Sequence, residues 1–163
     1  MIKTRKTRPG KSIDSTILKK NRLKSLLFTS SFLTYGLGDG ITAAYMMEKT
    51  GANIEANPLA KFMYVSYGSK GIVALKLWFT VVILSLVSTI SKRTGAYWAT
   101  NGFLFALTIG GLMATRANVL ATLGMPFPSP GSIIFTFLFM VILFLEVGNL
   151  IDKLYSNDKP VSC

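Results

Sequence analysis

The chain has 163 residues, half of them hydrophobic, with 18 Lys and Arg against 7 Asp and Glu and a formal net charge of +11. This composition, with a mean hydropathy of +0.46 over a length that suits one domain, is typical of a membrane protein. The chain has no His, which excludes histidine ligands and histidine general bases, and its single Cys163 excludes an internal disulfide. We therefore expect no metal site and no cofactor.

A basic arm, residues 1–25, opens the chain. Nine of the 18 basic residues precede Leu26, so the positive-inside rule predicts a cytoplasmic amino terminus. We expect residues 1–24 to be mobile when the protein is alone and to bind anionic lipid head groups or an acidic partner. Nucleic acid is the least favoured partner, and a topology signal that also rests on lipid is the preferred interpretation. The apolar run that follows is too long for a cleaved signal peptide and indicates a retained anchor.

Four apolar runs follow the arm, each near the ~20 residues that cross a bilayer as a helix. They are Leu26–Met47, Gly71–Ile90, Ala96–Leu120 and Ser132–Ile151. Lys92 and Arg93 separate the second run from the third, and Lys153 and Lys159 follow the fourth, which places these segments inside. The predicted fold is all-α, a multi-pass cell-membrane protein with four transmembrane helices in residues 26–155 and a cytoplasmic tail, residues 156–163. Both termini are predicted to be cytoplasmic.

Asp39 lies within the first apolar run, where a carboxylate costs about 2.5–3.5 kcal/mol on insertion scales. It therefore needs a partner. On the same run, Gly36 and Gly40 form a small-xxx-small pair that allows another helix to approach closely.

The loop after the first run contains Glu55, Asn57 and Pro58. Asn57 is a good N-cap and Pro58 suits the first helical position, so we predict a short interfacial helix that starts at Pro58. Glu55 and Asn57 then have two interpretations. They either cap this helix and complement its positive end, or belong to a binding site.

Lys76 is the best candidate partner for Asp39. At ~1.5 Å per residue, Lys76 lies about 8 Å and Asp39 about 12 Å from the same predicted outer boundary. Opposite charges at similar depth on consecutive helices predict a contact, direct or through water. The alternative is that Lys76 snorkels alone to the surface.

The third apolar run brings Arg116 and Asn118 to the same end, because Arg116 lies 20 residues after Ala96. Arg116 has a second interpretation, in which it simply ends the span. The predicted outer polar cluster comprises Asp39, Glu55, Asn57, Lys76, Arg116 and Asn118.

Glu146 and Asn149 lie one turn apart near the inner end of the fourth run. We expect Glu146 to be an interface carboxylate that meets Lys24 or Arg93.

The pattern of Asp39, the Glu55-Ala56-Asn57-Pro58 turn, Lys76 and Asn118 resembles a family of small four-helix prokaryotic membrane proteins classed as a domain of unknown function. The resemblance covers about Leu26–Leu123. It implies a shared polar cluster and no known activity.

Three functions are compatible with these features. The favoured hypothesis is an accessory or assembly subunit of a larger membrane complex, whose partners are lipids and other membrane subunits or a second copy. The first alternative is a small oligomeric transporter or channel-like protein with a cavity lined by Asp39, Lys76 and Arg116. The second is a membrane enzyme for an anionic lipid-like substrate, with Asp39 or Glu55 as general acid or base. No catalytic motif is recognisable, so we assign no catalytic residue and favour a non-enzymatic role.

Overall fold

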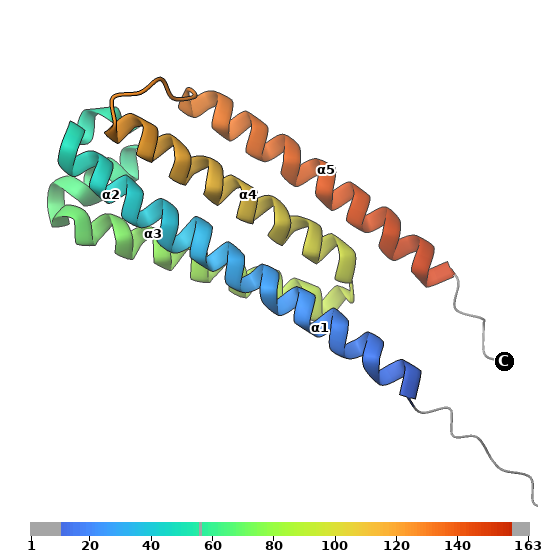
Figure 1. Cartoon of the computed structure of the whole chain (residues 1–163). Helices are drawn as coiled ribbons and strands as arrows, with labels where there is room; N and C mark the ends of the chain where they lie inside the picture. The colour runs from blue at the N-terminus through green and yellow to red at the C-terminus, as the bar shows by residue number, and fades with distance from the viewer. Residues whose placement is uncertain (1–10, 56, 158–163) are drawn as a thin grey trace, which may run out of the picture.

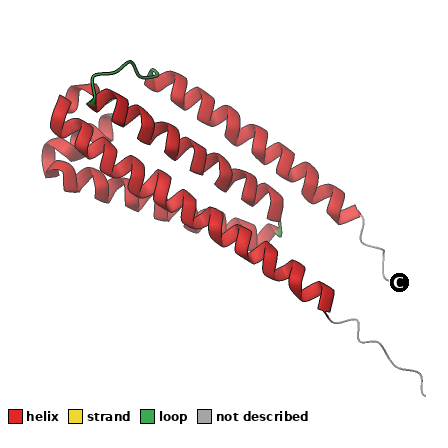
Figure 2. Ribbon diagram, in the orientation of Figure 1, coloured by secondary structure: helices red, strands yellow, loops and turns green. Residues whose placement is uncertain are grey.

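The computed structural model describes residues 11–55 and 57–157, except for the side chains of residues 11–17, 19, 20, 54 and 157. Within these ranges the ordered elements are all helices, as Figures 1 and 2 show, and no strand occurs. The predicted all-α fold is confirmed. The first ten residues of the basic arm and the last six of the tail lie outside the described residues.

The described chain begins with one long run of helix made from α1 (Lys11–Ser31), the π-helical η1 (Phe32–Gly38) and α2 (Asp39–Thr50). This run begins at Lys11, well before the Leu26 start of the predicted span. Between Lys11 and Gly36 the sequence contains no Pro or Gly, so nothing in it interrupts a helix. The run ends at Gly51, whose φ of 87° is open to glycine at little cost.

A short 3-10 helix η2 (Ala52–Ile54) leads to α3 (Pro58–Thr94), which contains a sharp break at Gly68 with φ 65° and ψ −160°. The break divides α3 into a short first segment and a long second one. Beside it, the hydroxyl of Ser69 donates a hydrogen bond to the Glu48 carboxylate at the end of α2. The short helix expected from Pro58 is therefore present, and its location at a membrane interface stays a prediction.

The second half consists of α4 (Tyr97–Thr122) and α5 (Pro130–Asn157), which run side by side in Figure 1. Helix α4 lies between α5 and the α1–η1–α2 run, and it contacts all of these elements. Glycines permit the close packing on both sides. A Cβ at Gly111 of α4 would lie 2.5 Å from the Tyr35 backbone nitrogen, and one at Gly148 of α5 would lie 2.5 Å from the Ala99 Cα.

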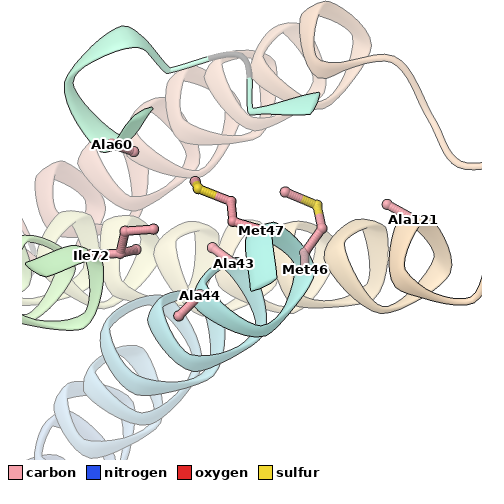
Figure 3. Packing of buried hydrophobic residues seen from close by; sticks show 7 residues of the cluster. All are labelled: Ala43, Ala44, Met46, Met47, Ala60, Ile72 and Ala121. Carbon is pink, nitrogen blue, oxygen red and sulfur yellow. The ribbon is translucent and has the colours of Figure 1, made fainter. Parts of the chain in front are cut away.

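The buried apolar core gathers where α2, the start of α3 and the end of α4 meet (Figure 3). Met46 and Met47 are its largest side chains on α2, and Ile72 on α3 is fully buried. Flexible Met side chains fill the space left by the small residues of this cluster. The remaining members are Ala43, Ala44, Ala60 and Ala121.

Three of the described helices are long and apolar enough to cross a membrane, namely α3, α4 and α5. Much of their apolar surface faces outward. Phe135 on α5, for example, is 73% exposed, which suits a lipid-facing position. The described helices thus indicate a multi-pass membrane protein, while the span predicted for Leu26–Met47 is divided among α1, η1 and α2.

Candidate functional site

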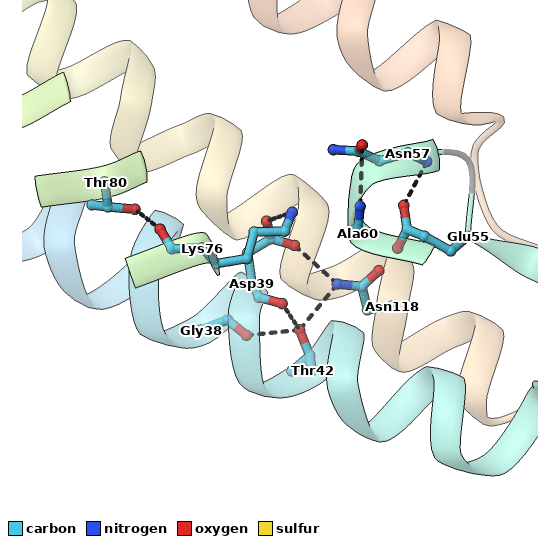
Figure 4. A network of polar contacts seen from close by, with 9 residues as sticks. All are labelled: Gly38, Asp39, Thr42, Glu55, Asn57, Ala60, Lys76, Thr80 and Asn118. Atoms are coloured by element: carbon cyan, nitrogen blue, oxygen red, sulfur yellow. Dashed lines mark hydrogen bonds and ion pairs between the residues drawn. The ribbon is translucent and has the colours of Figure 1, made fainter. Parts of the chain in front are cut away.

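Asp39 and Lys76 form an ion pair between α2 and α3. Lys76 Nζ lies 2.5 Å from Asp39 Oδ2, and Asp39 is only 4% exposed (Figure 4). Gly40 brings the two helices together, because a Cβ there would lie 3.3 Å from the Lys76 Cβ. The contact expected from matched depths is confirmed, and Lys76 does not snorkel alone to the surface.

Asn118 on α4 completes the hydrogen bonding of the buried carboxylate. Its Nδ2 donates to Asp39 Oδ1 at 3.0 Å and to Thr42 Oγ1 at 3.2 Å. The Thr42 hydroxyl donates in turn to the Gly38 carbonyl at 2.7 Å. Each carboxylate oxygen of Asp39 therefore accepts a hydrogen bond, which is the condition under which a buried ion pair is tolerated. Three helices are tied together at this one point.

Glu55 and Asn57 build the start of α3. Asn57 Oδ1 accepts from the backbone nitrogens of Leu59 at 3.0 Å and Ala60 at 3.4 Å, and this makes Asn57 the N-cap. Glu55 Oε1 accepts from the Asn57 backbone nitrogen at 2.8 Å. The capping interpretation is thus confirmed for Asn57, and the Glu55 carboxylate holds the residue that does the capping.

A cavity of about 460 Å³ connects these two parts of the site. We call it the Asp39 cavity. Its floor is formed by α2, α3 and α4, and residues from the α4–α5 loop and the first turns of α5 form the opposite wall. The lining residues are Asp39, Met46, Glu55, Asn57, Pro58, Lys76, Ala114, Ala117, Asn118, Ala121, Phe127, Pro128, Pro130, Ile133 and Ile134. Five of the six residues of the predicted cluster therefore border one space.

Arg116 is the member of the predicted cluster that the structure keeps apart. It is exposed on α4 and does not line the Asp39 cavity. Two residues along an α-helix correspond to about 200° of rotation, so Arg116 points away when Asn118 faces Asp39. The expected grouping is wrong for Arg116, because similar depth does not imply the same helix face.

The predicted ion pair of Glu146 is not formed. Glu146 and Asn149 are both exposed, and Glu146 makes no ion pair with Lys24 or Arg93 among the described side chains. Lys24 Nζ instead donates to Ser91 Oγ at 2.8 Å. The predicted Glu146 contact is therefore wrong, since the hydroxyl of α3 binds the lysine.

A carboxylate of α5 with a defined role is Asp152, which the sequence analysis missed. Its oxygens accept from the backbone nitrogens of Trp98 and Ala99 at 3.0 Å, which caps the amino terminus of α4 from the neighbouring helix. A signal exists in the sequence, because Ala96 precedes α4 and has no side chain that can cap it. No group of three or more potential metal-ligating side chains occurs in the described part of the chain.

The fold and the site thus define a helical, multi-pass membrane protein with a polar cluster in a cavity where α2, α3 and α4 meet. A family model described as a domain of unknown function, DUF5658, matches residues 31–125, more than half of the chain, and the chain belongs to this family. The matched residues include Asp39, Glu55, Asn57, Lys76 and Asn118, whereas α5 lies outside the match. No curated protein and no solved structure shows a significant match.

Proposed function

We propose that this chain is a four-span membrane protein that serves as an accessory or assembly subunit of a larger membrane complex. The observation that supports this role is a groove of about 490 Å³ along α4, between α3 and α5. We call it the α3–α5 groove. It is lined by Val87, Ile90, Thr94, Ala96, Ala99, Thr100, Phe103, Leu145 and Asn149.

A transmembrane helix of a partner subunit is the occupant that suits this lining. Ala96, Ala99 and Thr100 are small, and small residues let the backbone of another helix approach closely within a membrane. Asn149, which is exposed and carries an amide, also lines the groove. An acyl chain would leave that amide without a hydrogen bond, whereas a helix with a polar side chain satisfies it.

Two exposed residues on α3 provide a matched test of the groove. Ile90 lines it and is 58% exposed, and Leu86 is 57% exposed without lining it. Ile90→Trp overfills the groove, which costs about 1–3 kcal/mol in a packed contact and lowers the share of chain in the complex on blue-native electrophoresis. Leu86→Trp leaves the complex intact. A wild-type chain that migrates only as a monomer after mild solubilisation would contradict the subunit role.

The proposed topology places both termini in the cytoplasm of a cell-membrane protein, with the basic arm near anionic lipid. Uneven Lys and Arg on the predicted inner segments support it, and the α4–α5 connection carries no charge between Leu123 and Gly131. A membrane-impermeant thiol reagent should reach Ser129→Cys from outside in a Cys163→Ser background. If Ser129→Cys is labelled only in permeabilised cells, the α4–α5 connection lies in the cytoplasm and the proposed orientation is wrong.

The Asp39 cavity favours the alternative of a small oligomeric transporter, because a charged pair at the base of a cavity is a common feature of substrate paths. This alternative predicts flux in proteoliposomes that Asp39→Asn abolishes. Flux that Asp39→Asn leaves unchanged would argue against it.

A further inference from the structure

The Asp39 cavity carries an excess of negative charge. Among the described residues that line it, Asp39, Glu55 and Lys76 are charged, and the first and last of these neutralise each other through their ion pair. Glu55 is left as an additional carboxylate. Its Oε1 accepts from the Asn57 backbone, and its Oε2 accepts no hydrogen bond from the described part of the chain.

The remaining wall of the cavity is apolar. Ten of the fifteen described residues that line it are Ala, Met, Ile, Phe or Pro, with Phe127, Ile133 and Ile134 on the side of α5 and its preceding loop. With three charged groups of net charge −1, the cavity favours a cation, and the apolar wall reduces the screening of that attraction on its own side. An aromatic ring such as Phe127 adds attraction for an organic cation. The volume of about 460 Å³ is in the range of small-molecule sites.

We propose that the Asp39 cavity binds an organic ammonium ion, with the charged nitrogen between the Glu55 and Asp39 carboxylates and the apolar part against the α5 wall. Among the described residues none donates to Glu55 Oε2, and the Asp39 oxygens have acceptor capacity beyond the bonds from Lys76 and Asn118. Anions are disfavoured because the Lys76 ammonium is already bound to Asp39. A small inorganic cation would leave the apolar wall without contact.

This ammonium has two possible sources, a free amine or the ethanolamine headgroup of a phospholipid. Both present the same –NH₃⁺ group next to carbon atoms. The proposal does not depend on the α3–α5 groove, which lies on other residues, so the subunit role and the ammonium site can fail separately.

Isothermal titration calorimetry tests the site with hexylammonium chloride and the full chain in maltoside micelles, which carry no ammonium groups. Titration into empty micelles corrects for partition. We expect saturable binding that Glu55→Gln weakens by roughly tenfold or more, the value of a hydrogen bond to a charged group. Glu55→Gln keeps an acceptor oxygen for the Asn57 backbone, and so preserves the cap of α3. Circular dichroism checks that this variant is folded.

Two controls make the result specific. Glu146→Gln removes an exposed carboxylate that does not line the cavity, and it should bind hexylammonium as the wild type does. Hexanoate has the same chain length with opposite charge and should not bind. Equal affinity of the wild type and Glu55→Gln would overturn the proposal. Binding of hexanoate as tight as that of hexylammonium would also overturn it.

A change of lipid composition then distinguishes a free amine from the ethanolamine headgroup as the ligand. The titration is repeated in nanodiscs of phosphatidylglycerol with and without phosphatidylethanolamine. Weaker hexylammonium binding in the presence of phosphatidylethanolamine supports the site and identifies the headgroup as its ligand. Unchanged binding supports the site and identifies a free amine.

Discussion

The Asp39–Lys76 ion pair gives the sharpest prediction about stability. Lys76→Met removes the ammonium and leaves the carboxylate of Asp39, a residue that is 4% exposed, with Asn118 as the side-chain donor that remains among the described residues. Removing one partner of a buried ion pair costs about 3–5 kcal/mol, because the other charge stays buried without compensation. We expect a loss of that size in the free energy of unfolding of the Lys76→Met variant.

The double variant separates this cost from a simple packing defect. Asp39→Asn removes the charge that Lys76→Met leaves uncompensated, and an amide oxygen at position 39 still accepts from Asn118 Nδ2. The double variant should therefore recover most of the stability that Lys76→Met loses. Reversible unfolding in mixed micelles, followed by circular dichroism for both single variants and the double variant, yields the coupling energy.

A change of less than about 0.5 kcal/mol in the free energy of unfolding of Lys76→Met, the range of surface substitutions, would refute an uncompensated buried charge. Single losses that simply add in the double variant would refute it equally, because independent sites show additivity.

Three further predictions concern helix ends and helix contacts. Asn57→Ala should lower the free energy of unfolding by about 1 kcal/mol through loss of the N-cap of α3, measured in the same unfolding assay. Asp152→Ala should lower the free energy of unfolding more than Glu146→Ala does, because Asp152 accepts hydrogen bonds from two backbone nitrogens of α4 whereas Glu146 is exposed. Equal losses of unfolding free energy in the two variants would contradict the capping role. Gly111→Leu should lower the thermal stability strongly where α4 meets η1, whereas Gly131→Leu, where an added Cβ meets no atom within 4 Å, should be tolerated; thermal unfolding of both variants decides this.

The start of the first helix, within the basic arm, was not predicted from the sequence. Charge composition predicted a mobile segment before Leu26, and the structure extends α1 back to Lys11. Lys and Arg are good helix formers, and only a Pro or Gly would have stopped the helix locally. Net charge predicts a partner and a membrane orientation, but it does not set the end of a helix.

The sequence by itself determined the helical class, the apolar lengths of α3, α4 and α5, the N-cap at Asn57 and the partner of Asp39. These features depend on composition and on the distance of a residue along its own helix, and both can be read from the sequence of each segment alone. Only the tertiary structure decided that Asn118 faces Asp39 while Arg116 points away, and that Asp152 caps α4. These features depend on the rotation of each helix about its axis and on the choice of neighbour. Packing between distant segments sets both, and it also places the α5 wall over the Asp39–Lys76 pair to form the cavity.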